Sequence, residues 1–142
     1  MLTSPSAYAA FVYGLRERFA EIESSTLVLL PRSPTVAVLR GELLFAGGIR
    51  LRVVEQVDFA EARIHYYSYT VYRGEERLYW YDPQPHPNDP SLDSTHPHHK
   101  HVPPDIRHNR IPAPGLSFER PNLPMLIEEV ERALLTPEPP PT

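Results

Sequence analysis

The distribution of proline constrains the fold of this chain more than any other feature of its sequence. Eleven of the 18 prolines and six of the seven histidines lie between Asp82 and Pro124. Because proline lacks a backbone N–H and has a fixed φ, a segment this rich in proline cannot form a helix interior or a central strand. We therefore expect the regular elements before Asp82 and after Pro124, joined by a long Pro/His-rich loop.

Helical periodicity is found near both ends of the chain. Ser4 followed by Pro5 suits the start of a helix. Apolar residues then recur at helical spacing as far as Ile22, so we predict a helix that ends before Ser24 and Ser25. A second helix is predicted to begin at Asn122 and Pro124, and its apolar stripe is formed by Leu123, Leu126, Ile127, Val130 and Leu134.

Between Val36 and Asp82 the apolar residues alternate with a period of two, which is typical of strands. Val36–Phe45 and Ile49–Phe59 flank the short turn Ala46–Gly48 and predict a hairpin. Its register pairs Leu43 with Leu51 on one face and Glu42 with Arg52 on the other. A second hairpin joins Arg63–Arg73 to Arg77–Asp82 through a turn near Gly74.

These elements predict an α+β fold with a single antiparallel sheet of four to six strands, flanked by N- and C-terminal helices. The 142 residues suit one domain over residues 1–136, followed by a proline-rich tail over residues 137–142. No apolar run approaches about 18 residues, and the N-terminus lacks the pattern of a signal peptide. We therefore expect a cytoplasmic protein that does not enter the membrane.

Composition excludes several kinds of site. The chain has no cysteine, so it has no disulfide framework, thiolate metal site or cysteine nucleophile. A net charge of −4 argues against a broadly basic surface that coats nucleic acid, although a local basic cleft stays open.

The first candidate for chemistry is Glu55. It falls on the same face of its predicted strand as the apolar residues Val53 and Val57. A carboxylate in such a row must be paired, protonated or placed at the edge of a pocket. Both a catalytic role and a solvated position at the rim of the sheet fit this pattern.

The strongest candidate is the run His96–His101. In an extended chain His99 and His101 point to one side, and His98 and Lys100 point to the other. Two imidazoles could act as a general acid and base, the lysine could hold a phosphate, and His86 or Glu55 could orient one of them. We expect residues 86–101 to be ordered across the end of the sheet, near Glu55.

The same histidines also suit a divalent metal ion. Asp82, His86, His99 and His101 could bind zinc, nickel or manganese. A solvent-exposed histidine-rich loop with adventitious metal affinity is the alternative without function.

Together these residues show a resemblance to a known family. Several stretches resemble the TumE-like toxins of prokaryotic toxin–antitoxin systems, over roughly residues 36–135: Gly41–Phe45, Glu55, the strand Tyr66–Tyr69, Tyr81–Asp82, Pro85–His86 and His98–His101. The chain departs from that pattern at Pro83 and Pro87, so the second histidine of the family at the latter position has no counterpart here. The resemblance implies a toxin with a cognate antitoxin as partner.

For such a toxin, the simplest activity is RNA cleavage without a cofactor. His99 and His101 would transfer protons, Lys100 would stabilise the phosphorane, and Glu55 or His86 would assist. One alternative is a metal-dependent hydrolase or nuclease that uses Asp82 and the histidines. Another is a non-enzymatic protein that binds a metal or a partner, and a homo-oligomer stays open in each case.

Overall fold

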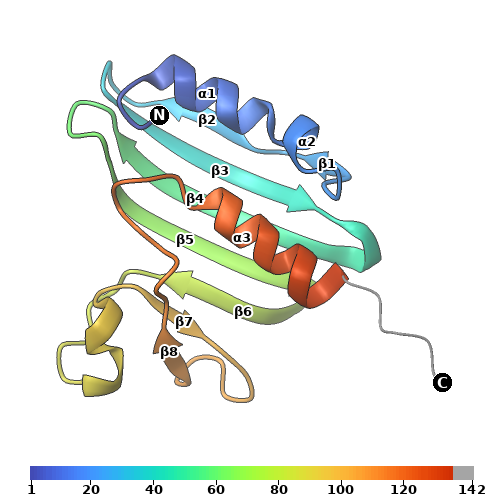
Figure 1. Ribbon diagram of the computed structural model, residues 1–142, viewed down its shortest axis with the longest axis vertical. Coiled ribbons are helices and arrows are strands. Elements are labelled where there is room, and N and C mark those ends of the chain that lie inside the picture. The colour runs from blue at the N-terminus through green and yellow to red at the C-terminus, as the bar shows by residue number, and fades with distance from the viewer. Residues whose placement is uncertain (136–142) are drawn as a thin grey trace.

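The computed structural model describes residues 1–135 and contains one antiparallel sheet with its α-helices on one side (Figure 1). The predicted tail, residues 137–142, and the domain end at residue 136 lie outside the described residues. The long strands are those of the two predicted hairpins, namely β3 (Val36–Leu44), β4 (Ile49–Asp58), β5 (Arg63–Arg73) and β6 (Glu76–Asp82).

The sheet has eight strands rather than the predicted four to six. The short strands are β1 (Ser24–Ser25), β2 (Val28–Pro31), β7 (His99–His101) and β8 (Arg110–Pro112). The order is β1-β3-β4-β5-β6-β7-β8, and β2 pairs with β3 as well. Strands of two to four residues are too short to show a period of two, so the sequence pattern did not predict them.

The register of the first hairpin is confirmed. Leu43 pairs with Leu51 and Glu42 with Arg52, and the turn is closed by Gly47 and Gly48 at φ values of 73° and 75°. Glycine adopts such angles without the strain of a side chain. The Glu42 carboxylate, however, accepts a hydrogen bond from Arg50 rather than from Arg52.

The N-terminal helix begins as predicted and ends earlier. The Ser4 hydroxyl accepts a hydrogen bond from the Ala7 N–H at 3.1 Å, and Pro5 starts α1 (Pro5–Tyr13). Gly14 separates α1 from the single turn α2 (Leu15–Arg18), so the predicted end near Ile22 is wrong. Glycine disfavours a continuous helix at that point, although Ile22 is still buried.

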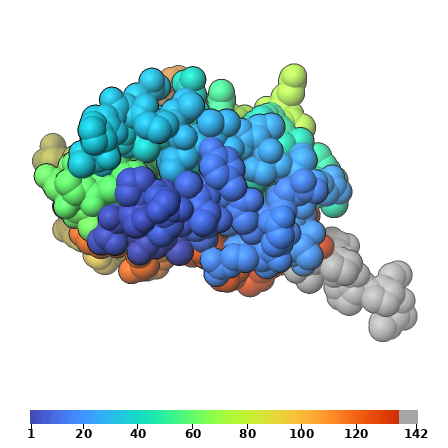
Figure 2. All heavy atoms as spheres, turned by 90° about the horizontal axis from the view of Figure 1, so that it is seen from above, coloured from blue at the N-terminus to red at the C-terminus, as the bar shows by residue number. Residues whose placement is uncertain are grey.

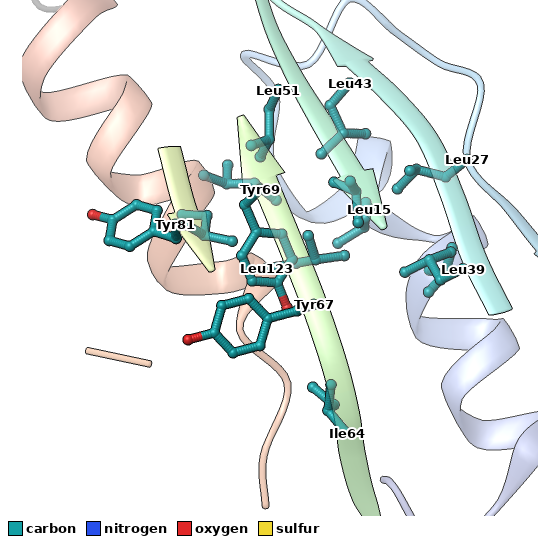
Figure 3. Close-up of a cluster of buried hydrophobic side chains, with 14 of the residues drawn as sticks. Leu15, Leu27, Leu39, Leu43, Leu51, Ile64, Tyr67, Tyr69, Tyr81 and Leu123 are labelled. Atoms are coloured by element: carbon teal, nitrogen blue, oxygen red, sulfur yellow. The ribbon is translucent and has the colours of Figure 1, made fainter. Parts of the chain in front are cut away.

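The C-terminal helix α3 (Leu123–Val130) follows Asn122 as predicted and is extended by one turn of π-helix over Glu131–Leu135. Its apolar stripe and that of α1 pack on the same face of the sheet, and leucines and tyrosines fill the space between (Figure 3). From above, the N-terminal residues lie against β2 and β3 (Figure 2). We call this the helical face; no α-helix within residues 1–135 covers the opposite, open face (Figure 1).

The Pro/His-rich segment is more regular than the predicted loop. It holds a 3-10 helix, Pro90–Thr95, as well as β7 and β8, and these strands extend the sheet beyond β6. The segment therefore carries the histidine run to a sheet edge, next to the end of β6. Within residues 1–135, no helix combines the length and the apolar character that crossing a membrane requires.

Candidate functional site

The pairing of β6 with β7 determines which side chains meet. Asp82 lies directly opposite His99, and Trp80 lies opposite His101. Residues opposite each other in adjacent strands share a face, and so do residues two apart in one strand. All four side chains therefore lie on the open face, where they form a compact cluster.

Three side chains converge at the centre of this cluster. The Asp82 carboxylate places one oxygen 3.2 Å from His99 Nε2 and the other 3.2 Å from His101 Nε2. The two Nε2 atoms are 3.1 Å apart. His99 is 1% exposed and His101 6% exposed, so bulk water is largely excluded from both rings. The predicted orientation of His99 and His101 to one side is thus confirmed.

The outer nitrogens of the two rings fix which atoms face inward. His99 Nδ1 lies 3.0 Å from the Pro97 carbonyl oxygen, and His101 Nδ1 lies 3.0 Å from the Ile106 carbonyl oxygen. A carbonyl oxygen only accepts hydrogen bonds, so each Nδ1 carries its proton and each ring turns Nε2 toward Asp82. The cluster can therefore be satisfied in two ways: by protonated imidazoles that donate from Nε2 to Asp82, or by a metal ion that binds the carboxylate and two neutral rings.

The charges in the cluster agree with this geometry. Partial burial would raise the pKa of Asp82, but hydrogen bonds from His101, His99 and the Gln84 N–H outweigh it and hold the pKa well below its usual range. Burial would lower the pKa of His99, but its bonds to Asp82 and to the Pro97 carbonyl outweigh that and raise the pKa. The site therefore has an ionised carboxylate that attracts positive charge.

Two imidazoles and one carboxylate are a common ligand set for zinc and other divalent ions. The ligand atoms of Asp82, His99 and His101 all lie within 4.8 Å of one another. Hydrogen bonds from Nδ1 to backbone carbonyls are the usual support for histidine ligands. Asp58, Glu61 and His65 also lie close together, but they are on an exposed turn, where Asp58 caps the N–H groups of Ala60 and Glu61.

His86 lies beside the cluster rather than within it. Its ring is 4.8 Å from the ring of His99, edge to face. Arg110 Nη1 approaches His86 Nδ1 to 2.8 Å. Burial and the nearby charges of Arg110 and His99 lower the pKa of His86. The structure therefore does not group His86 with the three ligand atoms, although the sequence predicted it as a ligand.

Lys100 points away from the histidines, onto the helical face. Its ammonium is 3.1 Å from Glu129 of α3 and 4.2 Å from the centre of the Tyr79 ring. Tyr81, which lies opposite Lys100, also donates to Glu129 at 2.7 Å. The predicted combination of Lys100 with His99 and His101 is not formed, because the strand alternation separates them.

Glu55 is also on the helical face, and it is completely buried. Tyr8 and Tyr69 donate hydrogen bonds to its two carboxylate oxygens, and Asn122 Nδ2 donates to Tyr69 Oη at 3.1 Å. Burial raises its pKa, and the two tyrosine bonds only partly offset this. Between β4 and β7 there are three strand spacings, roughly 14 Å. The expectation that residues 86–101 lie near Glu55 is therefore wrong for the cluster.

Sequence reasoning missed two neighbours of the cluster. Trp80 donates from Nε1 to Asp82 at 3.1 Å, and its ring stacks on His101 with centroids 4.0 Å apart. Its position two residues before Asp82 was the signal that placed it on the same face. Arg110 lies opposite His101 in β8, and only the structure reveals this register.

The cluster opens into a groove on the open face. The groove has a volume of about 600 Å³ and is lined by Asp82 together with Tyr66, Ser68, Gln84 and Phe118, among others. Asp82 has 19% of its side chain exposed, whereas the histidines beneath it are covered. A molecule in the groove would therefore approach the cluster from the side of the carboxylate.

The comparisons with known proteins give one match. A family model described as Toxin TumE matches residues 13–134. No curated protein and no solved structure matched the chain.

Proposed function

The chain belongs to the TumE toxin family, and from this premise we propose that it cleaves RNA at a divalent metal ion held by Asp82, His99 and His101. Membership makes it the toxin component of a toxin–antitoxin system, with an antitoxin as partner. RNA cleavage, the metal ion and action in the cytoplasm are the parts that we add. The observation that carries the proposal is the convergence of two Nε2 lone pairs and one carboxylate.

The geometry favours a metal ion over an acid–base pair. A general acid and a general base must each reach a different oxygen of the substrate. Here both Nε2 atoms point at the same carboxylate and are 3.1 Å apart, so without a metal they would direct their protons at Asp82 rather than at two separate oxygens of a substrate. A divalent ion instead satisfies all three acceptors at once, and zinc suits two imidazoles and a carboxylate best.

A metal ion at this place has a clear chemical use. Asp82, His99 and His101 would hold the ion next to the groove, where a phosphate could reach it. Such an ion would withdraw charge from the phosphate and so favour attack at phosphorus. In RNA the 2′-oxygen can then attack phosphorus, its proton passing to solvent, while the 5′-oxygen leaves and takes a proton. The products are a 2′,3′-cyclic phosphate and a 5′-hydroxyl.

The first test is metal dependence in a cleavage assay. Protein treated with chelator and dialysed is incubated with end-labelled single-stranded RNA. We expect no cleavage, recovery on addition of zinc or manganese, and one bound ion per chain by elemental analysis. An RNA with 2′-deoxyribose at the cleavage position should stay intact. Cleavage that survives the chelator and still needs His99 and His101 would overturn the metal and favour the acid–base alternative.

The second test uses variants. Asp82→Asn, His99→Ala and His101→Ala should each bind less than one ion per chain and lose at least the roughly 10–100-fold in rate that loss of a residue supporting a metal ligand costs. His108→Ala is the matched control, because this histidine is exposed and, within residues 1–135, its ring is bonded to Asp105 on a surface turn. If the three variants remain folded and cleave RNA at the normal rate, the cluster is not the active site.

A further inference from the structure

The open face continues from the cluster of Asp82, His99 and His101 across the sheet, and its side chains form regular rows. Arg52, Thr70, Trp80 and His101 are directly opposite one another on β4, β5, β6 and β7. In the next row Arg40 of β3 is followed by Val54 and Ser68. A ligand that enters the cluster thus has an unbroken surface leading to two arginines.

Arg40 and Arg52 have no acidic partner within residues 1–135. Both are exposed and line a second groove of about 710 Å³, together with Val28, Leu30 and Val54. The nearby carboxylates are engaged elsewhere: Glu42 accepts from Arg50, and Asp58 accepts from the N–H groups of Ala60 and Glu61. Despite the net charge of −4, this part of the open face presents two unpaired positive charges.

Tyr66 supplies an aromatic surface on β5, the strand that lies between those of the arginines and those of the cluster. It is 47% exposed, and its ring stacks on no other ring within the described residues. It lines the groove that contains Ser68 and Asp82. The Trp80 ring, in contrast, is already in contact with His101 and Arg77. Tyr66 is therefore the residue that can stack on a base.

We propose that the open face binds single-stranded RNA, with a base stacked on Tyr66 and phosphates bound by Arg40 and Arg52. This proposal rests on the proposed function, because it names the substrate of that site. Aromatic side chains on an exposed sheet face commonly stack two or three bases of a single strand. The backbones of Arg52 and His101 are three strand spacings apart, roughly 14 Å, so a few nucleotides link the phosphate-binding arginines to the metal cluster. A duplex would not expose its bases to Tyr66.

The test measures binding apart from cleavage. Fluorescence anisotropy is recorded with a labelled single-stranded 2′-O-methyl RNA, which cannot be cleaved through its 2′-oxygen, in the presence of chelator. For a single strand, each phosphate contact contributes about 0.7 to the slope of log K against log salt. Arg40→Gln combined with Arg52→Gln should therefore reduce the slope by about 1.4, which weakens binding about 25-fold at 0.1 M salt. Arg16→Gln with Arg18→Gln, on α2, removes equal charge and should leave binding unchanged.

The role of Tyr66 is tested by how much RNA affinity its variants lose and by whether the salt dependence of binding changes. Tyr66→Ala should weaken binding about 5- to 100-fold, the usual effect of removing one stacked base, and leave the salt slope unchanged. Tyr66→Phe keeps the ring and should bind normally. The proposal is overturned if both sets of variants bind RNA as the parent does, if the parent prefers duplex RNA, or if the arginine variants lose only the antitoxin. If the parent never cleaves RNA but the variants still lose RNA binding, the proposed function is refuted. The inference that the open face binds single-stranded RNA would then still hold.

Discussion

Replacing Glu55 with glutamine tests whether this buried carboxylate supports the fold or the chemistry. Glu55 accepts hydrogen bonds from Tyr8 and Tyr69 and is fully buried. The amide in Glu55→Gln keeps one acceptor for Tyr8, but it places an NH₂ group against Tyr69 Oη, which already accepts from Asn122. One buried hydrogen bond is lost and its donor is left without an acceptor, which costs about 2 kcal/mol and lowers Tm by about 6–8 °C for a domain of this size.

The pH dependence of this loss is a sharper test than its size. Burial raises the folded-state pKa of Glu55, so the folded state binds more protons than the unfolded state above the ordinary glutamate pKa. The stability that Glu55 contributes is therefore full below that ordinary value and is lost as pH rises through the folded-state pKa. Glutamine does not titrate, so the difference in Tm between the parent and Glu55→Gln should be largest near pH 4.5 and shrink as pH rises.

Thermal melts from pH 4.5 to 8, with RNA cleavage measured on the same samples, check both points. Groups that titrate in both proteins cancel in the difference. A Tm difference that stays constant with pH would refute the argument from burial. A folded Glu55→Gln protein whose cleavage rate falls by two or more orders of magnitude would show that Glu55 acts in the site despite lying on the helical face.

Three further predictions concern the rest of the molecule. Lys100→Met should lower Tm by about 5–10 °C, because it removes a bond to Glu129 worth about 1.5–3 kcal/mol, and it should leave the RNA cleavage rate unchanged. Gly41→Ala should destabilise the protein by about 3 kcal/mol or more in urea unfolding, since a Cβ at φ +138° would lie 2.5 Å from the Thr26 carbonyl oxygen. Gly47→Ala is the control: its Cβ meets no atom within 4 Å, so it should cost about 1 kcal/mol. Zinc should slow amide hydrogen exchange in residues 83–121 while leaving β3, β4 and β5 unchanged.

The parts of the fold that the sequence predicted are those that depend on nearby residues. The register of β3 with β4 follows from a three-residue turn and an alternating pattern, and the structure has the same pairs. The start of α1 at Ser4 and Pro5 is equally local. That His99 and His101 point to the same side follows from the alternation of side chains in an extended chain alone.

The relation between distant strands could not be predicted in the same way. Whether Glu55 and His99 share a face depends on three successive registers, and β-bulges interrupt the ladders after Gln56 and after Val71. Each bulge adds one residue and so changes which side chains face a given side. The pairing of Asp82 with His99 spans a proline-rich segment of 16 intervening residues, whose path no periodicity describes. For this reason the sequence does not predict that Glu55 and His99 lie on opposite faces, whereas the alternation within β7 alone separates Lys100 from His99 and His101.

The position of the cluster also gives it a structural role in the Pro/His-rich segment. Of residues 83–121, Ala113 and Leu116 are buried in the main hydrophobic core, Phe118 packs against it, and Leu92 is buried apart from it. One buried leucine contributes roughly 1.5–3 kcal/mol, which is small beside the entropy of ordering so many residues. Three residue pairs hold β7 to β6. Two of them belong to the cluster, namely Asp82 with His99 and Trp80 with His101. A cation bound by one ligand from β6 and two from β7 would join the segment to the sheet directly. Catalysis and ordering would then depend on the same ion, and the chelator would loosen the segment while the four long strands keep their core.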